Sequence, residues 1–243
     1  MHKNKSIVCV IPARMQSTRF PRKMVAPLGG KPLIQWAFEG AKKVSFFDKV
    51  VVAVDGDELY DVVTGFGGEA LITSPDCLSG TDRLIELQQT GKIQGDIWVN
   101  WQGDEPFLTE ETIASLVQTC DAPGGEIWTL KKKIIKEEEI ESPHVVKVVC
   151  DARGRALYFS RSCIPSDKKN LYAHVGIYAY TNEALRKIGS FSPSPLEKQE
   201  RLEQLRYLYH GMQIEVHEIS QEIFGIDTKE ELAIAEQMCY HFT

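Results

Sequence analysis

The sequence predicts a single-domain α/β fold in which helices flank a mostly parallel, mixed central sheet. Short apolar runs alternate with amphipathic helical stretches in the first half of the chain, and glycine, proline and aspartate mark the turns between them. Antiparallel pairing is indicated only in the second half, by a hairpin pattern. With 243 residues, of which 43% are hydrophobic, the chain is long enough for one substantial core.

The first half is predicted to alternate strand and helix. Apolar runs rich in valine and isoleucine are the expected strands, at residues 7–10, 49–54, 70–73 and 96–101. A helix is expected after each of them, at 32–47, 58–66, 81–89 and 109–120. In the first helix Leu33, Ala37 and Ala41 recur at the spacing of one helical face, and Gly67-Gly68 ends the second. Strands joined by helices predict crossover connections and parallel pairing.

The second half has a different pattern. The expected elements are a hairpin at 145–150 and 155–159, a strand at 172–180 and a helix at 196–210. The helix residues expected to face inward are Leu202, Leu205, Leu208 and Tyr209. The lysines at 131–133 and the glutamates at 137–139 are interpreted as a solvated surface element. A further helix is expected to begin near Lys229.

Composition excludes several classes of function. The net charge of −6 and the pI near 5.6 argue against nucleic-acid binding, which normally needs a basic face. The six cysteines form no C-x-x-C pair and have no histidine at zinc-ligand spacing, which predicts reduced thiols and a cytoplasmic protein. Pro12 and Arg14 end the first apolar run after about seven residues, too few for a signal peptide or a membrane span.

A basic loop directly after the first strand is the strongest functional signal. Arg14, Arg19, Arg22 and Lys23 can bind phosphate oxygens, and Ser17 and Thr18 add hydroxyl groups. Open α/β sheets bind ligands at the carboxyl ends of their strands, where this loop is expected. The pattern favours a nucleoside triphosphate site, and the alternative is a solvated basic turn.

Carboxylates follow two other apolar segments. Asp104 comes just after the strand at 96–101 with Gly103 before it, and Asp227 precedes the last helix. Carboxylates at such positions are natural Mg²⁺ ligands, because magnesium prefers one or two carboxylates together with phosphate oxygens. The alternatives are a turn-capping aspartate for Asp104 and a helix N-cap for Asp227.

Taken together, these motifs give the chain a resemblance to the 3-deoxy-manno-octulosonate cytidylyltransferases, the enzymes that make CMP-KDO for lipopolysaccharide. The resemblance spans nearly the whole chain. The matching segments, in chain order, are Ile11–Lys23, Ser79–Arg83, Gln102–Pro106, Ala156–Arg161, His174–Tyr178, Leu202–Arg206 and Gly225–Thr228. Each motif alone is weak, but their shared order is specific.

The resemblance implies a role for each matching residue. The residues it assigns to catalysis are Arg14, Lys23, Asp104 and Asp227, with Asp104 and Asp227 as Mg²⁺ ligands. The residues it assigns to the nucleotide CTP are Ala13, Arg14, Ser17, Lys23, Ser79, Gly80 and Thr81. The residues it assigns to the sugar acid KDO are Arg19, Gln102, Arg161, His174, Tyr178, Glu203 and Gln204.

The implied domain is nucleotidyltransferase-like. It comprises a nucleotide-binding half at 1–130, a smaller sugar-binding and dimerisation part at 145–215 and a return to the main sheet at 216–243. The implied reaction is attack of the KDO anomeric hydroxyl on the α-phosphorus of CTP with release of pyrophosphate, in a homodimer with no membrane or nucleic-acid partner. Alternatives are an 8-amino-KDO or sialic-acid-like substrate, a GT-A-type glycosyltransferase using Asp55-Gly56-Asp57, and a non-catalytic nucleotide-binding relative.

Arg22 departs from the family pattern, which has glycine near the loop lysine. Its side chain is expected to add a contact to the triphosphate and so to tighten CTP binding, or else to point into solvent.

Overall fold

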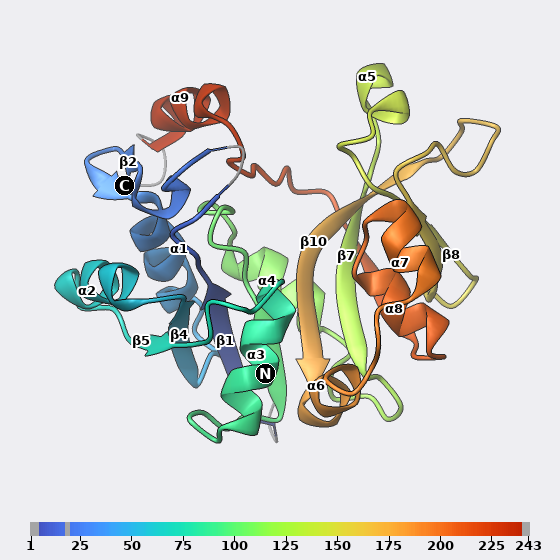
Figure 1. Ribbon diagram of the computed structural model, residues 1–243. Helices are drawn as coiled ribbons and strands as arrows, with labels where there is room; N and C mark the ends of the chain where they lie inside the picture. The colour runs from blue at the N-terminus through green and yellow to red at the C-terminus, as the bar shows by residue number, and fades with distance from the viewer. Residues whose placement is uncertain (1–4, 18–19, 240–243) are drawn as a thin grey trace. The chain divides into compact units, whose positions relative to one another are not determined.

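The computed structural model describes residues 5–17 and 20–239. The chain forms two compact units, one of Met1–Ile113 with Glu222–Thr243 and one of Ala114–Gln221. Figure 1 shows the elements of both, and each unit is described by itself below.

The sheet of the first unit is wholly parallel. Its strands lie in the order β6 (Ile97–Asn100), β1 (Ile7–Pro12), β4 (Lys49–Val54) and β5 (Ala70–Ile72). The register aligns Cys9 with Val50 on one side and with Val99 on the other. Strands β6, β1 and β4 are almost entirely buried, as expected for a parallel sheet that is covered on both faces, whereas Ile72 of the edge strand β5 is 40% exposed.

Helices connect these strands. They are α1 (Leu33–Lys42), α2 (Asp57–Gly65) and α3 (Gly80–Gln89), and α4 (Glu110–Val117) follows β6. Right-handed crossovers place α1 and α2 on one face of the sheet and α3 on the other, because the chain moves from β1 to β5 and then returns to β6. The strand order therefore reverses beside β1. In such sheets ligands bind at the carboxyl ends of the strands next to the reversal.

The C-terminal segment packs against the start of the first unit. The helix α9 (Lys229–Met238) lies near the small hairpin of β2 (Pro27–Leu28) and β3 (Lys31–Pro32), which follows the 3-10 helix η1 (Lys23–Val25). A shared apolar cluster holds them together: Leu28, Leu33, Trp36, Ile226, Ala235 and Cys239. This packing returns the segment before α9 to the carboxyl ends of β1 and β6.

The second unit has a mixed sheet. Strand β7 (Ile127–Lys133) pairs parallel with β11 (Ile214–Ile219) and antiparallel with β10 (Tyr172–Thr181). Strands β8 (Lys147–Cys150) and β9 (Ala156–Ser160) form the predicted hairpin, and β8 also pairs with β10. The helices of this unit are α5 (Glu137–Glu141), α6 (Asn182–Ile188), α7 (Pro195–Glu200) and α8 (Gln204–Tyr209). The predicted α/β class, with parallel strands, a mixed later part and flanking helices, is confirmed.

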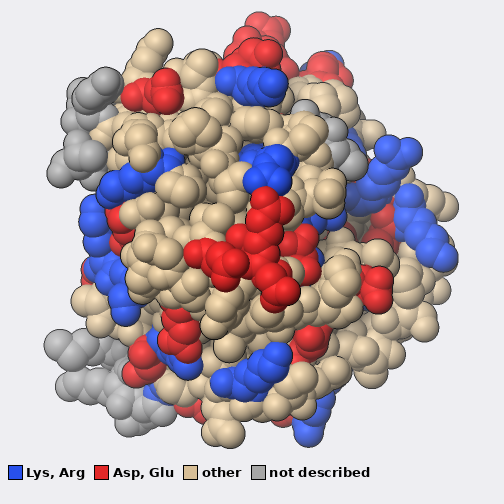
Figure 2. All heavy atoms as spheres, turned by 60° about the vertical axis from the view of Figure 1, so that its left-hand side comes forward, with Lys and Arg blue, Asp and Glu red and all other residues tan. Residues whose placement is uncertain are grey.

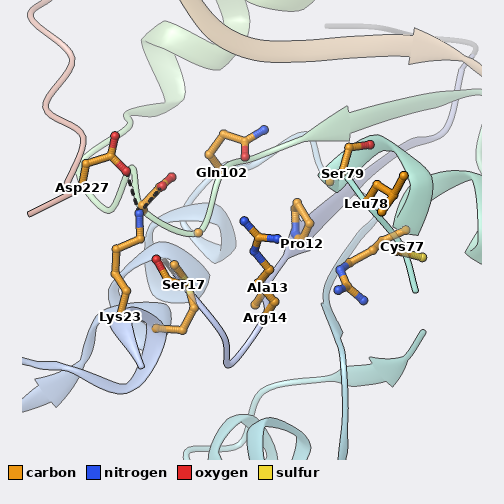
Figure 3. A pocket seen from close by; sticks show the side chains of 15 residues that line it. Pro12, Ala13, Arg14, Ser17, Lys23, Cys77, Leu78, Ser79, Gln102 and Asp227 are labelled. Carbon is orange, nitrogen blue, oxygen red and sulfur yellow. Dashed lines mark hydrogen bonds and ion pairs between the residues drawn. The ribbon is translucent and has the colours of Figure 1, made fainter. Parts of the chain in front are cut away.

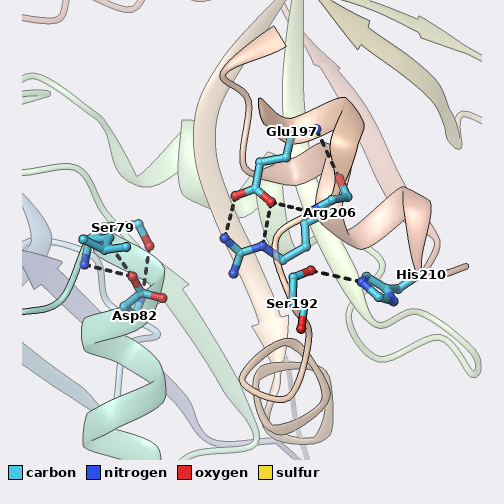
Figure 4. A network of polar contacts seen from close by, with 8 residues as sticks. Ser79, Asp82, Ser192, Glu197, Arg206 and His210 are labelled. Atoms are coloured by element: carbon cyan, nitrogen blue, oxygen red, sulfur yellow. Dashed lines mark hydrogen bonds and ion pairs between the residues drawn. The ribbon is translucent and has the colours of Figure 1, made fainter. Parts of the chain in front are cut away.

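The single helix predicted at 196–210 is wrong. The chain forms α7 and α8, because Arg201 adopts a left-handed conformation with φ of 56° and ends α7. The break turns Tyr207 into the core, whereas Tyr209, predicted to face inward, is 55% exposed. The two helices are joined by Arg206, whose Nε donates to Glu197 Oε2 at 2.8 Å (Figure 4).

The lysine run at 131–133 is not part of a solvated element. It continues strand β7, where the Lys131 and Lys132 side chains are only 15% and 19% exposed. Lys131 Nζ lies 3.9 Å from the centre of the Tyr172 ring, a cation–π contact across the β7–β10 pair. Neither β7 nor β11 was predicted, and for β7 the reason is that lysine side chains can cover apolar surface while their ends reach water.

The remaining features concern surface charge, the cysteines and the length of the helices. On the face shown in Figure 2, acidic side chains gather in a cluster at the centre, and basic side chains lie around it. All six cysteines are free thiols. Among the described residues, no helix has the length and apolarity that crossing a membrane requires.

Candidate functional site

A cavity of about 220 Å³ opens in the first unit where β1 and β6 end (Figure 3). Side chains from the loops after β1 and β6, from the start of α3 and from the segment before α9 line it. The predicted site residues that line it are Ala13, Arg14, Ser17, Lys23, Ser79, Gly80, Gln102, Asp104 and Asp227. Residues separated by more than a hundred positions in the sequence thus meet at the strand-order reversal.

The basic loop after β1 is anchored by its backbone. Ala13 N donates to Ala53 O at 2.8 Å, and Met15 N donates to both oxygens of the Asp55 carboxylate, the shorter contact at 2.9 Å. Arg14, between these anchors, is exposed and extends into the cavity. Asp55 is therefore occupied in holding this loop, which removes the support for a metal motif at Asp55-Gly56-Asp57.

Lys23 is the electrostatic centre of the cavity. Its Nζ donates to Asp104 Oδ2 at 2.7 Å and to Asp227 Oδ1 at 2.9 Å, and the lysine is 6% exposed. Burial lowers the pKa of Lys23, but the two carboxylates outweigh burial and hold this pKa above its usual value. The ammonium is therefore charged and holds two carboxylates within reach of one cation.

Asp227 is placed by backbone contacts, and it is not the N-cap of α9. Ile226 N donates to Asp104 O at 2.9 Å, which brings the two aspartate segments together. Thr228 caps α9, and its side chain forms a reciprocal capping box with Glu231. The helix start does not depend on the Asp227 carboxylate, which instead binds Lys23.

Glu105 lies beside the site, near Asp104 and Asp227, and no role was predicted for it. Its Oε2 is buried and has no hydrogen-bond partner among the described residues. Burial, with a smaller contribution from the nearby charges of Asp104 and Asp227, raises the pKa of Glu105 to about 8. The only available sequence signal was its position next to Asp104, because burial of a carboxylate depends on the tertiary fold.

The Glu105→Gln variant is expected to gain stability relative to the wild type as pH rises from about 4.5 to about 8. The folded pKa near 8 lies above the unfolded value, so the folded wild type holds a proton that the unfolded chain has lost, and its stability falls as pH rises. Glutamine does not ionise. Each pH unit in that window contributes about 1.4 kcal/mol to the difference.

Urea unfolding of both proteins across this pH range, without added metal, tests the expectation. Glu138→Gln, at an exposed glutamate of α5, is the matched control. A stability difference between Glu105→Gln and the wild type that stays constant with pH would show that Glu105 ionises normally.

The two aspartates fit a magnesium ion. Their carboxylates both reach one ammonium group in this structure, so they are close enough to share a cation. Mg²⁺ takes one or two protein carboxylates and completes its shell with phosphate oxygens and water, and the donor set here is of that kind. The Lys23 ammonium occupies one oxygen of each carboxylate.

The opposite wall of the cavity is the start of α3. Ser79 caps the helix by accepting from Asp82 N at 3.1 Å, and Asp82 Oδ2 accepts from Ser79 N at 2.9 Å (Figure 4). A side chain at Gly80 would place its Cβ 2.9 Å from Pro12 Cγ, so only glycine allows this close approach. Thr81 is 2% exposed and is buried beneath this wall.

Arg83 also lines the cavity, although no role was predicted for it. It is only 3% exposed, and its Nη1 donates to Thr73 Oγ1 at 2.6 Å and to Ser74 O at 3.1 Å. These bonds fix the loop before α3, so the arginine adds a positive charge to a rigid wall.

The predicted sugar-site residues divide between the two units. Gln102 lines the cavity of the first unit, and its Nε2 donates to Asn100 Oδ1 at 3.2 Å. Arg19 lies outside the described residues. The others stand on β10, on α8 with its N-cap and just after β9 of the second unit: Arg161, His174, Tyr178, Glu203 and Gln204.

On the second unit, His174 and Tyr178 are in contact, with ring centres 5.4 Å apart. Burial lowers the pKa of His174 to about 3, so its ring is neutral at physiological pH. Burial raises the pKa of Tyr178 well above its usual value, and the charge of Glu203 adds to this rise. Arg161 is held by backbone carbonyls, with Nε donating to Glu200 O at 3.0 Å and Nη1 to Pro143 O at 2.8 Å.

Comparison with known proteins identifies the family. A family model described as "Cytidylyltransferase" matches residues 8–214. The 3-deoxy-manno-octulosonate cytidylyltransferase of Thermodesulfovibrio yellowstonii is 43% identical, over 95% of this chain and 96% of the relative. The protein of the same name from Acidobacterium capsulatum is 41% identical, over 96% of each chain.

A solved structure gives the same result. The structure of CMP:2-keto-3-deoxy-manno-octonic acid synthetase complexed with CTP has a TM-score of 0.91 and 38% identity, and it covers 98% of this chain and 100% of that chain. Sequence motifs, fold and relatives therefore agree, and the resemblance seen in the sequence is confirmed: the chain belongs to the 3-deoxy-manno-octulosonate cytidylyltransferase family.

Proposed function

We propose that this protein joins CTP and 3-deoxy-manno-octulosonate to give CMP-KDO and pyrophosphate, as a step of lipopolysaccharide synthesis. The observation that carries the proposal is the Lys23–Asp104–Asp227 cluster beside Arg14, at the carboxyl ends of β1 and β6. A cavity that holds the cations Arg14 and Lys23 together with two carboxylates fits a triphosphate with its metal ion.

The first unit would hold the nucleotide. Arg14 and Lys23 supply positive charge to the phosphate oxygens, and Arg14 can form paired hydrogen bonds because its guanidinium is planar. The base and ribose would lie against the Ser79–Gly80 wall, where Gly80 lets the backbone come close. Catalysis then consists of alignment and of charge neutralisation as pyrophosphate leaves.

The magnesium ion would be held by Asp104 and Asp227. When bound, the ion neutralises phosphate charge and lowers the pKa of an oxygen that it polarises. The Lys23 ammonium contacts one oxygen of each aspartate in the structure, so it would compete with the ion, and its release of either oxygen would make that oxygen available for binding. A lysine freed in this way is placed to pair with phosphate instead.

The sugar acid would be bound by Gln102 with Arg19, Arg161, His174, Tyr178, Glu203 and Gln204. The chemical support is a neutral imidazole, a buried phenol and neighbouring polar groups, which suit a polyhydroxylated substrate. Pyrophosphate release from CTP in the presence of Mg²⁺ tests the assignment, with KDO, 8-amino-KDO and a sialic acid as acceptors. Turnover confined to KDO supports the assignment. Turnover confined to another sugar acid would show that this other acid is the substrate.

The same assay tests the base preference. UTP, ATP and GTP are expected to be poor donors, because the wall at Ser79–Gly80 is rigid and close-packed. Comparable turnover with a purine triphosphate would contradict the placement of the base.

Arg22→Gly is expected to leave the KM for CTP unchanged, contrary to the contact expected from the sequence. Arg22 Nη2 pairs with Glu58 Oε1 at 2.6 Å, and the residue does not line the cavity. The arginine also has φ of 59°, a left-handed conformation that glycine adopts without strain. Steady-state kinetics at low and high salt check this. A salt-dependent rise in the KM for CTP would show that Arg22 contacts the triphosphate.

We further propose a cytoplasmic homodimer. Strand β10 does not offer a free edge at Ala173, because this residue pairs with β7 and with β8. The strand β9 instead presents Leu157, which is 62% exposed, and a second copy could cover it. Sedimentation equilibrium at micromolar concentration tests this, and a single 27.4 kDa species would contradict it.

A further inference from the structure

An irregularity in the β7–β10 pair surrounds Thr129. The register shifts between Val175 and Tyr178, so that Val175 pairs with Leu130 while Tyr178 pairs with Thr129. Gly176 and Ile177 therefore have no partner on β7 in this ladder, which makes the irregularity a bulge. Bulges re-aim side chains, and this one lies between His174 and Tyr178 in the chain.

The Thr129 hydroxyl fills the bulge. Thr129 is fully buried, with 0% exposure, and its Oγ1 has three polar neighbours on β10. Val175 O lies at 3.1 Å, Ile177 O at 2.8 Å and His174 Nε2 at 3.0 Å. These contacts join the main chain of the bulge to the imidazole.

The number of protons fixes the direction of these bonds. A hydroxyl carries one proton, and a carbonyl oxygen can only accept. If Thr129 donated to His174 Nε2, its lone pairs would face both carbonyl oxygens at hydrogen-bonding distance. That arrangement is unfavourable, because neither carbonyl oxygen has a proton to donate. If Thr129 donates instead to a carbonyl, of which Ile177 O at 2.8 Å is the nearer, its remaining lone pairs can accept from Nε2. His174 must then carry its proton on Nε2.

We infer that Thr129 is a positioning residue that sets the tautomer of His174, so that the histidine presents a bare Nδ1 as a hydrogen-bond acceptor. Nδ1 makes no hydrogen bond within the described part of the chain. Phe159 packs edge-on against the ring, with centres 4.9 Å apart, and restricts its rotation. The ring remains neutral at physiological pH because burial lowers its pKa to about 3.

This assignment predicts what His174 recognises. A neutral Nδ1 accepts a hydrogen bond and cannot donate one, so its partner must be a donor such as a sugar hydroxyl. The sugar's carboxylate cannot fill this role, because it only accepts. This step rests on the proposed function, whereas the tautomer itself does not.

The tautomer can be measured without any substrate. In ¹⁵N-histidine-labelled protein, long-range ¹H–¹⁵N spectra distinguish a protonated ring nitrogen from a bare one, and His174→Gln assigns the signal. We expect Nε2 to be protonated and Nδ1 bare at neutral pH. A protonated Nδ1 or a doubly protonated ring would overturn the inference, whatever the substrate proves to be.

Variants of Thr129 test its effect on the reaction. Thr129→Val removes the hydroxyl at similar volume and is expected to raise the KM for KDO about tenfold, the usual effect of one lost hydrogen bond, with the KM for CTP unchanged. Its His174 signal should become a mixture of tautomers. Thr129→Ser keeps the hydroxyl, so its KM for KDO and its His174 signal should match those of the wild type. This comparison holds even if the valine variant folds poorly.

A control separates this effect from general damage. Thr112→Val changes another buried threonine, 1% exposed, in the first unit. It should leave the His174 spectrum and the KM for KDO unaltered. A Thr129→Val protein with wild-type KM for KDO and an unchanged spectrum would refute the positioning role. Inactivity of the wild type with KDO would instead refute the proposed function. The tautomer of His174 would still be tested by the ¹⁵N spectrum, which needs no substrate.

Discussion

Asp104→Asn and Asp227→Asn should each lower kcat by at least about 10²-fold, because a missing ligand misplaces the ion that stabilises the transition state. Each substitution leaves Lys23 one carboxylate partner, since the ammonium contacts both aspartates. The fold should therefore lose little stability. Steady-state kinetics over a range of Mg²⁺ concentrations, together with thermal unfolding, measure the two effects.

The structure sharpens this test for Asp227. Asparagine is a good N-cap, and α9 is already capped by Thr228. Thr228→Ala is the matched control, and it should reduce thermal stability while leaving kcat nearly intact. Near-normal turnover in Asp227→Asn would mean that Asp227 has only a structural role, and a rate defect rescued by higher Mg²⁺ would support ligation.

The elements that could be predicted from sequence are those whose pattern is local. The strands of the first unit are runs of buried apolar residues, and β4 occupies the predicted residues 49–54. Strand β7 was missed because its second half is lysine, and only the tertiary fold shows that Lys131 covers the Tyr172 ring. The break at Arg201 was missed because a left-handed arginine has no local signature.

In the candidate site, too, the sequence predicts individual residues but not the contacts that depend on the tertiary fold. Lys23, Asp104 and Asp227 were each predicted from a motif, but their meeting at 2.7 and 2.9 Å depends on how the strands return to one edge. Glu105 was missed because its buried oxygen and raised pKa are properties of the packed loop. Arg22 was expected near phosphate because charge alone was visible, and its partner Glu58 lies on another element.

Lys23→Met should change turnover and metal affinity in opposite directions. Loss of the ammonium removes a group proposed to stabilise the departing phosphate charge, so kcat is expected to fall about 10²- to 10³-fold. The same loss removes the ammonium that contacts Asp104 Oδ2 and Asp227 Oδ1 at 2.7 and 2.9 Å in the structure. Mg²⁺ then binds without displacing the Lys23 ammonium.

Calorimetric titration with MgCl₂, in the absence of nucleotide, measures the second effect. The affinity of Lys23→Met should exceed that of the wild type by about tenfold, which corresponds to about 1.4 kcal/mol. Lys23→Arg is the control, because it keeps a cation against the carboxylates and should not tighten binding. If Lys23→Met bound Mg²⁺ no better than the wild type, the carboxylates would not form the metal site, and Lys23 would serve only to neutralise them. If turnover also stayed normal, the cluster would be structural, since a buried lysine between two aspartates can stabilise a fold without touching a substrate.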